Sequence, residues 1–153
     1  MIEFRDYQKD IISRGIGILK PHRFLYLAME VRTGKTLTSL GICEKLHIKK
    51  VLFITKKKAI SSIKNDHGWD VVICDEAHGM GAFPKPSGRS KKVSRLVYRS
   101  NPYVILLSGT PTPEAYSQMY HQVHFIPRNP FATYKNFYQF ANNYVSVVKK
   151  KIG

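Results

Sequence analysis

Cysteine, acidic residues and long apolar runs are all scarce in this sequence of 153 residues. Its two cysteines, Cys43 and Cys74, stand far apart and form no C-x-x-C pair, which leaves a disulfide framework or a zinc site without support. No apolar run approaches the roughly 20 residues that a membrane-spanning helix needs, and the first residues carry no signal-peptide pattern. These absences predict an intracellular, cytoplasmic protein that does not enter a membrane.

The charge is strongly one-sided. Only 10 residues are acidic, against 25 lysines and arginines, so the formal net charge is +15. A domain this basic attracts polyanions, because neutralising phosphates releases their condensed counterions. With 43% hydrophobic and 23% charged residues, the composition is that of a folded chain. The charge supports a nucleic-acid partner, and a basic surface that only serves solubility is an equal alternative.

Short apolar runs alternate with amphipathic stretches, which is typical of a parallel α/β sheet. The runs lie at residues 24–28, 51–54, 71–74 and 103–107. They are nearly continuous, as expected for strands that are covered on both faces. Apolar stripes at helical spacing occur within residues 11–19, 37–46, 93–97 and 134–141. We predict an α/β fold with a mostly parallel sheet, as one domain over residues 1–153, and a loop at 79–90.

A candidate phosphate-binding loop follows the first apolar run. Residues 29–36 read Met-Glu-Val-Arg-Thr-Gly-Lys-Thr and lead into a helical pattern, so backbone N–H groups and a helix N-terminus can surround phosphates. We expect Gly34 to let the main chain approach, Lys35 to reach the β- and γ-phosphates, and Thr36 to bind Mg²⁺. Met29 stands where the usual pattern has its first glycine. The predicted ATP-binding residues here are Arg32, Thr33, Gly34, Lys35 and Thr36.

Two further polar motifs follow later strands. Residues 75–78 read Asp-Glu-Ala-His after a buried run, where carboxylates are costly unless their charge is used. We expect Asp75 to hold Mg²⁺ and Glu76 to orient the attacking water, with His78 in the same catalytic motif. A solvent-facing acidic pair is the alternative. The fourth run ends in three small residues placed to sense the γ-phosphate: Ser108, Gly109 and Thr110.

In this order the three motifs resemble motifs I, II and III of the superfamily 2 DEAD/DEAH helicases, most closely the SNF2-like and phage-type members. The resemblance implies a RecA-like P-loop NTPase lobe with helices on both faces of its sheet, using ATP and Mg²⁺. It also implies that Gln8, supported by Arg5, recognises adenine. The segment equivalent to motif Ia implies nucleic-acid backbone contacts at Lys56, Lys57 and Lys58.

A second basic cluster follows the acidic motif, and Lys85 and Arg89 are our candidates for further phosphate contacts. A merely solvated basic helix face is an equal alternative. Only 16 residues, 59–74, separate Lys58 from Asp75, whereas members of the family usually carry an additional strand and helix there. We therefore expect a sheet that is one strand–helix unit short, through a natural shortening, an engineered deletion or an omitted segment.

The predicted function is that of the ATP-binding lobe of a helicase or translocase, with DNA favoured over RNA, in a bacterial cell or a phage-infected host. We expect that the second RecA-like lobe and its arginines are absent, so that the chain alone binds Mg-ATP weakly and hydrolyses it slowly or not at all. One alternative is a non-catalytic, truncated module that binds nucleotide or nucleic acid. Another P-loop enzyme, such as a small-molecule kinase, leaves the second and third motifs unexplained.

Overall fold

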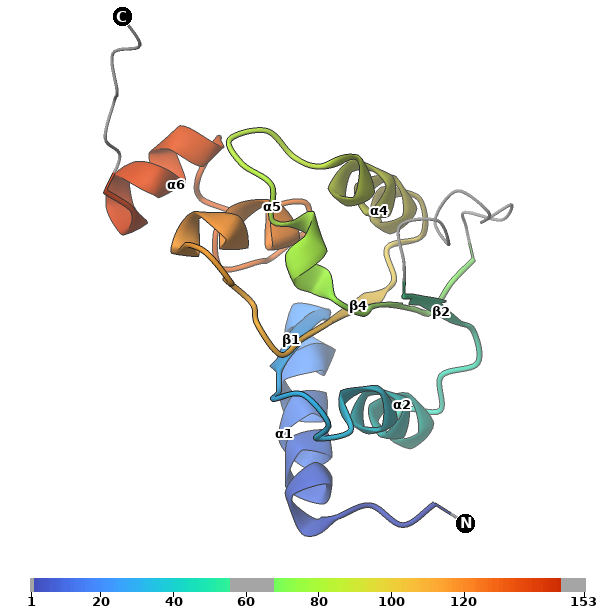
Figure 1. Ribbon diagram of the computed structural model, residues 1–153. Coiled ribbons are helices and arrows are strands. Elements are labelled where there is room, and N and C mark those ends of the chain that lie inside the picture. The colour runs from blue at the N-terminus through green and yellow to red at the C-terminus, as the bar shows by residue number, and fades with distance from the viewer. Residues whose placement is uncertain (1, 56–67, 147–153) are drawn as a thin grey trace, which may run out of the picture.

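A parallel sheet with helices on both faces organises the computed structural model, which describes residues 2–55 and 68–146 (Figure 1). Its strands are β1 (Phe24–Ala28), β2 (Val51–Ile54), β3 (Val71–Cys74) and β4 (Tyr103–Ser108). They are ordered β1-β4-β3-β2, and all three pairings are parallel. The predicted α/β class and the four predicted strands are confirmed.

The two central strands are the most deeply buried, since helices cover both of their faces. All four residues of β3 are buried, and so are five of the six in β4. Because every strand runs in the same direction, the loops that follow β1, β3 and β4 leave the sheet at one edge. β2 pairs directly with β3, so within the described residues no further strand lies between them.

Two helices cover one face of the sheet: α1 (Asp6–His22) and α2 (Lys35–Lys45). They pack their apolar stripes, including Leu19 and Ile42, against Ile73 and Ile105 of the central strands. The two helices approach closely because Gly41 lacks a side chain: a Cβ there would lie 2.7 Å from atoms of both Ile12 and Phe4. The first half of α1 is thereby packed directly against α2.

The opposite face carries the remaining helices (Figure 1). These are η1 (Ala77–Met80), α4 (Gly88–Ser100), η2 (Tyr116–Met119), α5 (Tyr120–Val123) and α6 (Phe137–Tyr144). Aromatic rings fill much of this side of the core, with Tyr120 and Phe140 almost fully buried. Within the described residues, no helix combines the length and the hydropathy that a bilayer crossing requires.

Helix caps explain two differences from the predicted boundaries. The stretch 79–90, predicted as a loop, contains the end of η1 and the first turn of α4, because the Ser87 hydroxyl accepts a hydrogen bond from the backbone N–H of Ser90 at 3.1 Å. The last helix begins later than the apolar spacing indicated. Asn136 caps it through the backbone N–H of Gln139 at 3.0 Å.

Candidate nucleotide-binding site

The loop between β1 and α2 is held in a tight, inward-folded conformation. The Thr33 hydroxyl donates to the carbonyl of Glu30 at 2.6 Å, and Lys35 Nζ reaches the same carbonyl at 3.4 Å. The Gly34 carbonyl accepts hydrogen bonds from both the backbone N–H and the hydroxyl of Thr38, each at 2.9 Å. Hydrogen bonds to its own backbone carbonyls therefore stabilise the conformation of the loop.

Gly34 is the residue that this geometry requires. Its φ of +79° lies in the left-handed region, which glycine adopts without strain. A Cβ at this position would also lie 2.5 Å from Gln8 Nε2. Because Gly34 caps α2 without a side chain, the first N–H groups of the helix and its positive dipole end are left for an anion.

The start of α1 supports the loop from the outside. Gln8 is buried; its amide Oε1 accepts from the backbone N–H of Arg5 at 2.9 Å and its Nε2 donates to the carbonyl of Thr33 at 3.4 Å. Tyr7, which the sequence analysis missed, donates from its hydroxyl to the same carbonyl at 2.9 Å. Gln8 therefore lies against the phosphate-binding loop, with support from the backbone of Arg5. Adenine recognition by Gln8 stays a prediction.

The acidic pair faces the same cleft as the loop. Asp75 follows β3 directly, and its carboxylate accepts from the backbone N–H of Glu76 at 2.9 Å. A cavity of about 430 Å³ opens at this edge of the sheet. Its walls include residues of both motifs: Arg32, Gly34, Lys35, Thr36, Asp75 and Glu76. The two motifs therefore line one cleft. The role of each residue in it stays a prediction.

Motif II and motif III are joined by side-chain contacts. His78 Nε2 lies 3.3 Å from Glu76 Oε2, and His78 Nδ1 lies 2.8 Å from the hydroxyl of Ser108. The Ser108 hydroxyl also accepts from the backbone N–H of Thr110 at 3.1 Å. Gly109 packs against the start of the phosphate-binding loop, where a Cβ would lie 3.3 Å from the carbonyl of Met29. All three motifs are therefore in physical contact.

Arg89 is buried, which does not fit the nucleic-acid contact that was predicted for it. It is only 7% exposed, and its guanidinium donates to the carbonyls of Asp75 and Glu76, the latter at 3.0 Å. A side chain so placed holds the backbone of the acidic motif and is turned away from any external phosphate. We therefore remove Arg89 from the candidate nucleic-acid contacts. Nothing in the sequence separated it from the exposed basic residues around it.

The other predicted nucleic-acid contacts differ in what the structure says of them. Lys85 is exposed, on the loop that precedes α4. Lys56, Lys57 and Lys58 lie outside the described residues. No group of three His, Cys, Asp or Glu side chains able to hold a metal alone was found in the part of the chain that the structure describes. Thr36 and Asp75 nevertheless fit Mg²⁺, which is usually held by one or two carboxylates together with substrate phosphates and water.

Comparison with known proteins agrees with this geometry. A family model of the SNF2-related domain matches residues 28–152. Among solved structures, the fold is similar to that of the Sulfolobus solfataricus SWI2/SNF2 ATPase core in complex with dsDNA, with a TM-score of 0.69 and 16% sequence identity. No curated protein matches.

The similarity to the solved ATPase core covers 92% of this chain but only 38% of that one, so the chain spans well under half of its length. At this low identity the similarity bears on the fold, and the predicted RecA-like architecture is confirmed. The family model covers most of the chain, including all three motifs that line or border the cleft. The chain therefore belongs to the SNF2-related domain family.

Proposed function

We propose that this chain is the ATP-binding lobe of a nucleic-acid-dependent ATPase, which couples ATP hydrolysis to movement on nucleic acid when a second RecA-like lobe joins it. The observation that carries the proposal is the shared cleft of about 430 Å³, into which the loops after β1 and β3 both turn. Membership of the SNF2-related domain family and the similarity to an ATPase core solved with dsDNA support it.

The phosphate-binding loop supplies binding energy for the triphosphate. Backbone N–H groups at Gly34 and the start of α2 donate to phosphate oxygens, and the Lys35 ammonium pairs with the β- and γ-phosphates. Thr36 and Asp75 hold Mg²⁺, which neutralises charge on the phosphate oxygens. The Gln8 side-chain amide contacts this loop through the Thr33 carbonyl. To hydrogen-bond the edge of an adenine base, the amide must keep or exchange that contact.

Glu76 is the group that orients the attacking water and accepts its proton. Its carboxylate is about half exposed at the cleft, and the contact with His78 Nε2 fixes its direction. His78 in turn contacts the Ser108 hydroxyl, so a change at the γ-phosphate that moves Glu76 also moves motif III. This connection is the proposed path from ATP to the rest of the lobe.

Movement and full hydrolysis need more than this lobe. An arginine finger, a catalytic arginine from a partner element, contributes on the order of 10³–10⁵ in rate in NTPases that use one. Translocation requires two bodies whose separation changes with the nucleotide. We propose that a second lobe, in the same or another chain, supplies both. We also propose that DNA is the substrate: the net charge of +15 favours a polyanion, and the similar ATPase core was solved in complex with dsDNA.

The test is an ATPase assay on the protein joined to its second lobe, with and without DNA or RNA. We expect stimulation by DNA in the wild type, ATP binding weakened by at least about tenfold in Lys35→Ala, and a rate reduced by roughly 10²–10⁴ in Glu76→Gln with ATP binding retained. Lys45→Ala, an exposed lysine of the same helix α2, is the matched control. Equal rates in all four proteins would show that the cleft is not catalytic, as in a truncated binding module.

A further inference from the structure

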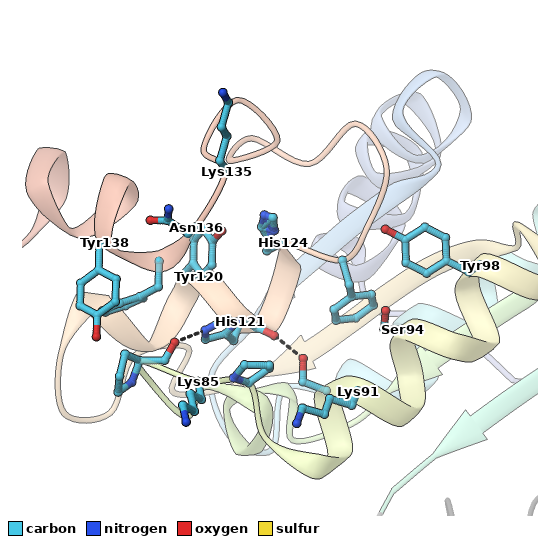
Figure 2. A pocket seen from close by; sticks show the side chains of 15 residues that line it. Lys85, Lys91, Ser94, Tyr98, Tyr120, His121, His124, Lys135, Asn136 and Tyr138 are labelled. Carbon is cyan, nitrogen blue, oxygen red and sulfur yellow. Dashed lines mark hydrogen bonds between the residues drawn. The ribbon is translucent and has the colours of Figure 1, made fainter.

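A second cavity, of about 450 Å³, lies on the face of the sheet opposite α2 (Figure 2). It is open to solvent and is lined by the loop before α4, by α4 itself, by α5 and by the segment that leads into α6. It shares no lining residue with the cleft that holds Lys35 and Asp75. Its volume falls within the roughly 300–1,000 Å³ typical of ligand sites.

Positive charge surrounds this cavity without compensation. Lys85, Lys91 and Lys135 come from three separate segments and are all exposed. No Asp or Glu occurs among the described residues that line it, and no ion pair engages these lysines within residues 2–55 and 68–146. Burial lowers the pKa of both His121 and His124, so these rings stay neutral near pH 7. The three lysines therefore suit the cavity to an anion, and the neutral histidines add no charge to it.

Flat rings supply the rest of the lining. Tyr98 and Tyr138 are 73% and 62% exposed and lie on opposite sides of the cavity, with His121 between them in the view of Figure 2. The His121 ring is fixed, because its Nε2–H donates to the carbonyl of Pro84 at 2.6 Å and its face stacks on Phe137 with ring centroids 6.0 Å apart. Proteins bind single-stranded nucleic acid through such surfaces, because the bases stack on exposed aromatic rings and the phosphates pair with neighbouring lysines.

We propose that this cavity binds a segment of single-stranded nucleic acid, with bases stacked on the tyrosines and phosphates held by the lysines. The inference rests on the proposed function, since it supplies that function with a nucleic-acid contact surface among the described residues. An acidic peptide satisfies the lysines equally well but leaves the exposed ring faces without a stacking partner. The observations therefore favour a nucleic acid.

Helix α4 connects the proposed strand site to the ATP cleft. The Ser90 hydroxyl donates to the carbonyl of His121 at 2.7 Å, within the lining of the cavity. The preceding residue, Arg89, holds the carbonyls of Asp75 and Glu76. The first turn of α4 thus contacts both the lining of the cavity and the backbone of the acidic motif.

The test is binding of a short, fluorescein-labelled oligothymidylate to the chain, measured by anisotropy at several salt concentrations. In the Lys91→Ala/Lys135→Ala variant we expect weaker binding and a log–log salt slope smaller by about 1.4, since each single-strand phosphate contact contributes about 0.7. Tyr138→Ala is expected to weaken binding at least about fivefold, and Tyr138→Phe to restore it, because stacking needs only the ring.

The matched control is Lys20→Ala/Lys45→Ala, which removes two exposed lysines on the α1 and α2 face. Thermal unfolding of every variant checks that it is folded. Photo-crosslinking of a 4-thiothymidine oligonucleotide is expected to label peptides that contain Tyr138 or His121.

Three outcomes overturn the inference in distinguishable ways. If the Lys91→Ala/Lys135→Ala and Tyr138→Ala variants bind oligothymidylate as tightly as the control variant does, the strand binds elsewhere and the proposed function is unaffected. Absence of nucleic-acid binding in the wild type at low salt, with binding of a fluorescent ATP analogue retained, removes the nucleic-acid part of the proposed function as well. Poly-glutamate that binds more tightly than oligothymidylate, and whose binding is lost in Lys91→Ala/Lys135→Ala but kept in Tyr138→Ala, assigns the cavity to an acidic protein partner.

Discussion

Replacing Arg89 by methionine tests whether the acidic motif depends on a buried cation. The guanidinium donates to two backbone carbonyls, those of Asp75 and Glu76, in a position that is 7% exposed. Hydrogen bonds from charged donors stabilise the folded state by about 1.5–3 kcal/mol each, and leaving a buried carbonyl unpaired costs a similar amount. Part of this loss is offset, because the substitution removes a buried charge. It also removes the buried Arg89 Nε–H, for which no acceptor occurs among the described residues. We expect a net destabilisation of about 2–4 kcal/mol.

For a domain of this size, 1 kcal/mol shifts Tm by roughly 2–4 °C, so Arg89→Met is expected to lower Tm by roughly 5–15 °C in calorimetry. Arg95→Met removes an exposed arginine from the same helix α4 and is expected to change stability by no more than about 0.5 kcal/mol. Arg89→Lys, with a single ammonium for two carbonyls, is expected to fall between them. If Arg89→Met and Arg95→Met unfold at the same temperature, the buried-clamp reasoning is refuted.

Three other predictions follow from the geometry. Gly34→Ala places a side chain at φ +79°, at a cost of about 1–2 kcal/mol, and is expected to abolish binding of a fluorescent ATP analogue, whereas Gly17→Ala, with open space around its Cβ, leaves that binding unchanged. Burial lowers the pKa of His121 and His124 from the ordinary value of 6.5, so below about pH 6.5 the unfolded chain binds more protons than the folded chain. The urea concentration at the unfolding midpoint is therefore expected to fall as the pH drops through 6.5, and a midpoint independent of pH contradicts this. Burial also raises the pKa of Cys74 to about 12, so a disulfide reagent at neutral pH is expected to label it only after denaturation; labelling of the native chain rejects that burial.

The strands were predictable because buried parallel strands leave a direct mark on the sequence. Each nearly continuous apolar run became a strand, and β4 extends the predicted run 103–107 by one residue, to Ser108. The Gly-Lys-Thr loop and the acidic pair were also predictable as neighbours, since parallel strands bring their carboxyl ends to one edge of a sheet. Local patterns therefore sufficed wherever function and fold use the same strand ends.

Features that depend on long-range packing were not predictable. Arg89 and Lys91 look alike in sequence, and only the path of α4 buries the first and exposes the second. Tyr7 gained its role from the contact between α1 and the loop at Thr33, 26 residues away. The second cavity joins Lys85 to Tyr138, which no local pattern relates.

Calorimetric titration of a non-hydrolysable ATP analogue, with and without Mg²⁺, is the most direct test of the shared cleft. We expect Lys35→Ala to weaken binding by at least about tenfold, since it removes a charge-assisted contact. Asp75→Asn is expected to bind as the wild type does without Mg²⁺, because it removes the carboxylate that holds the metal. Equal affinity of the wild type and both variants, with or without Mg²⁺, contradicts a cleft in which the two motifs bind one nucleotide.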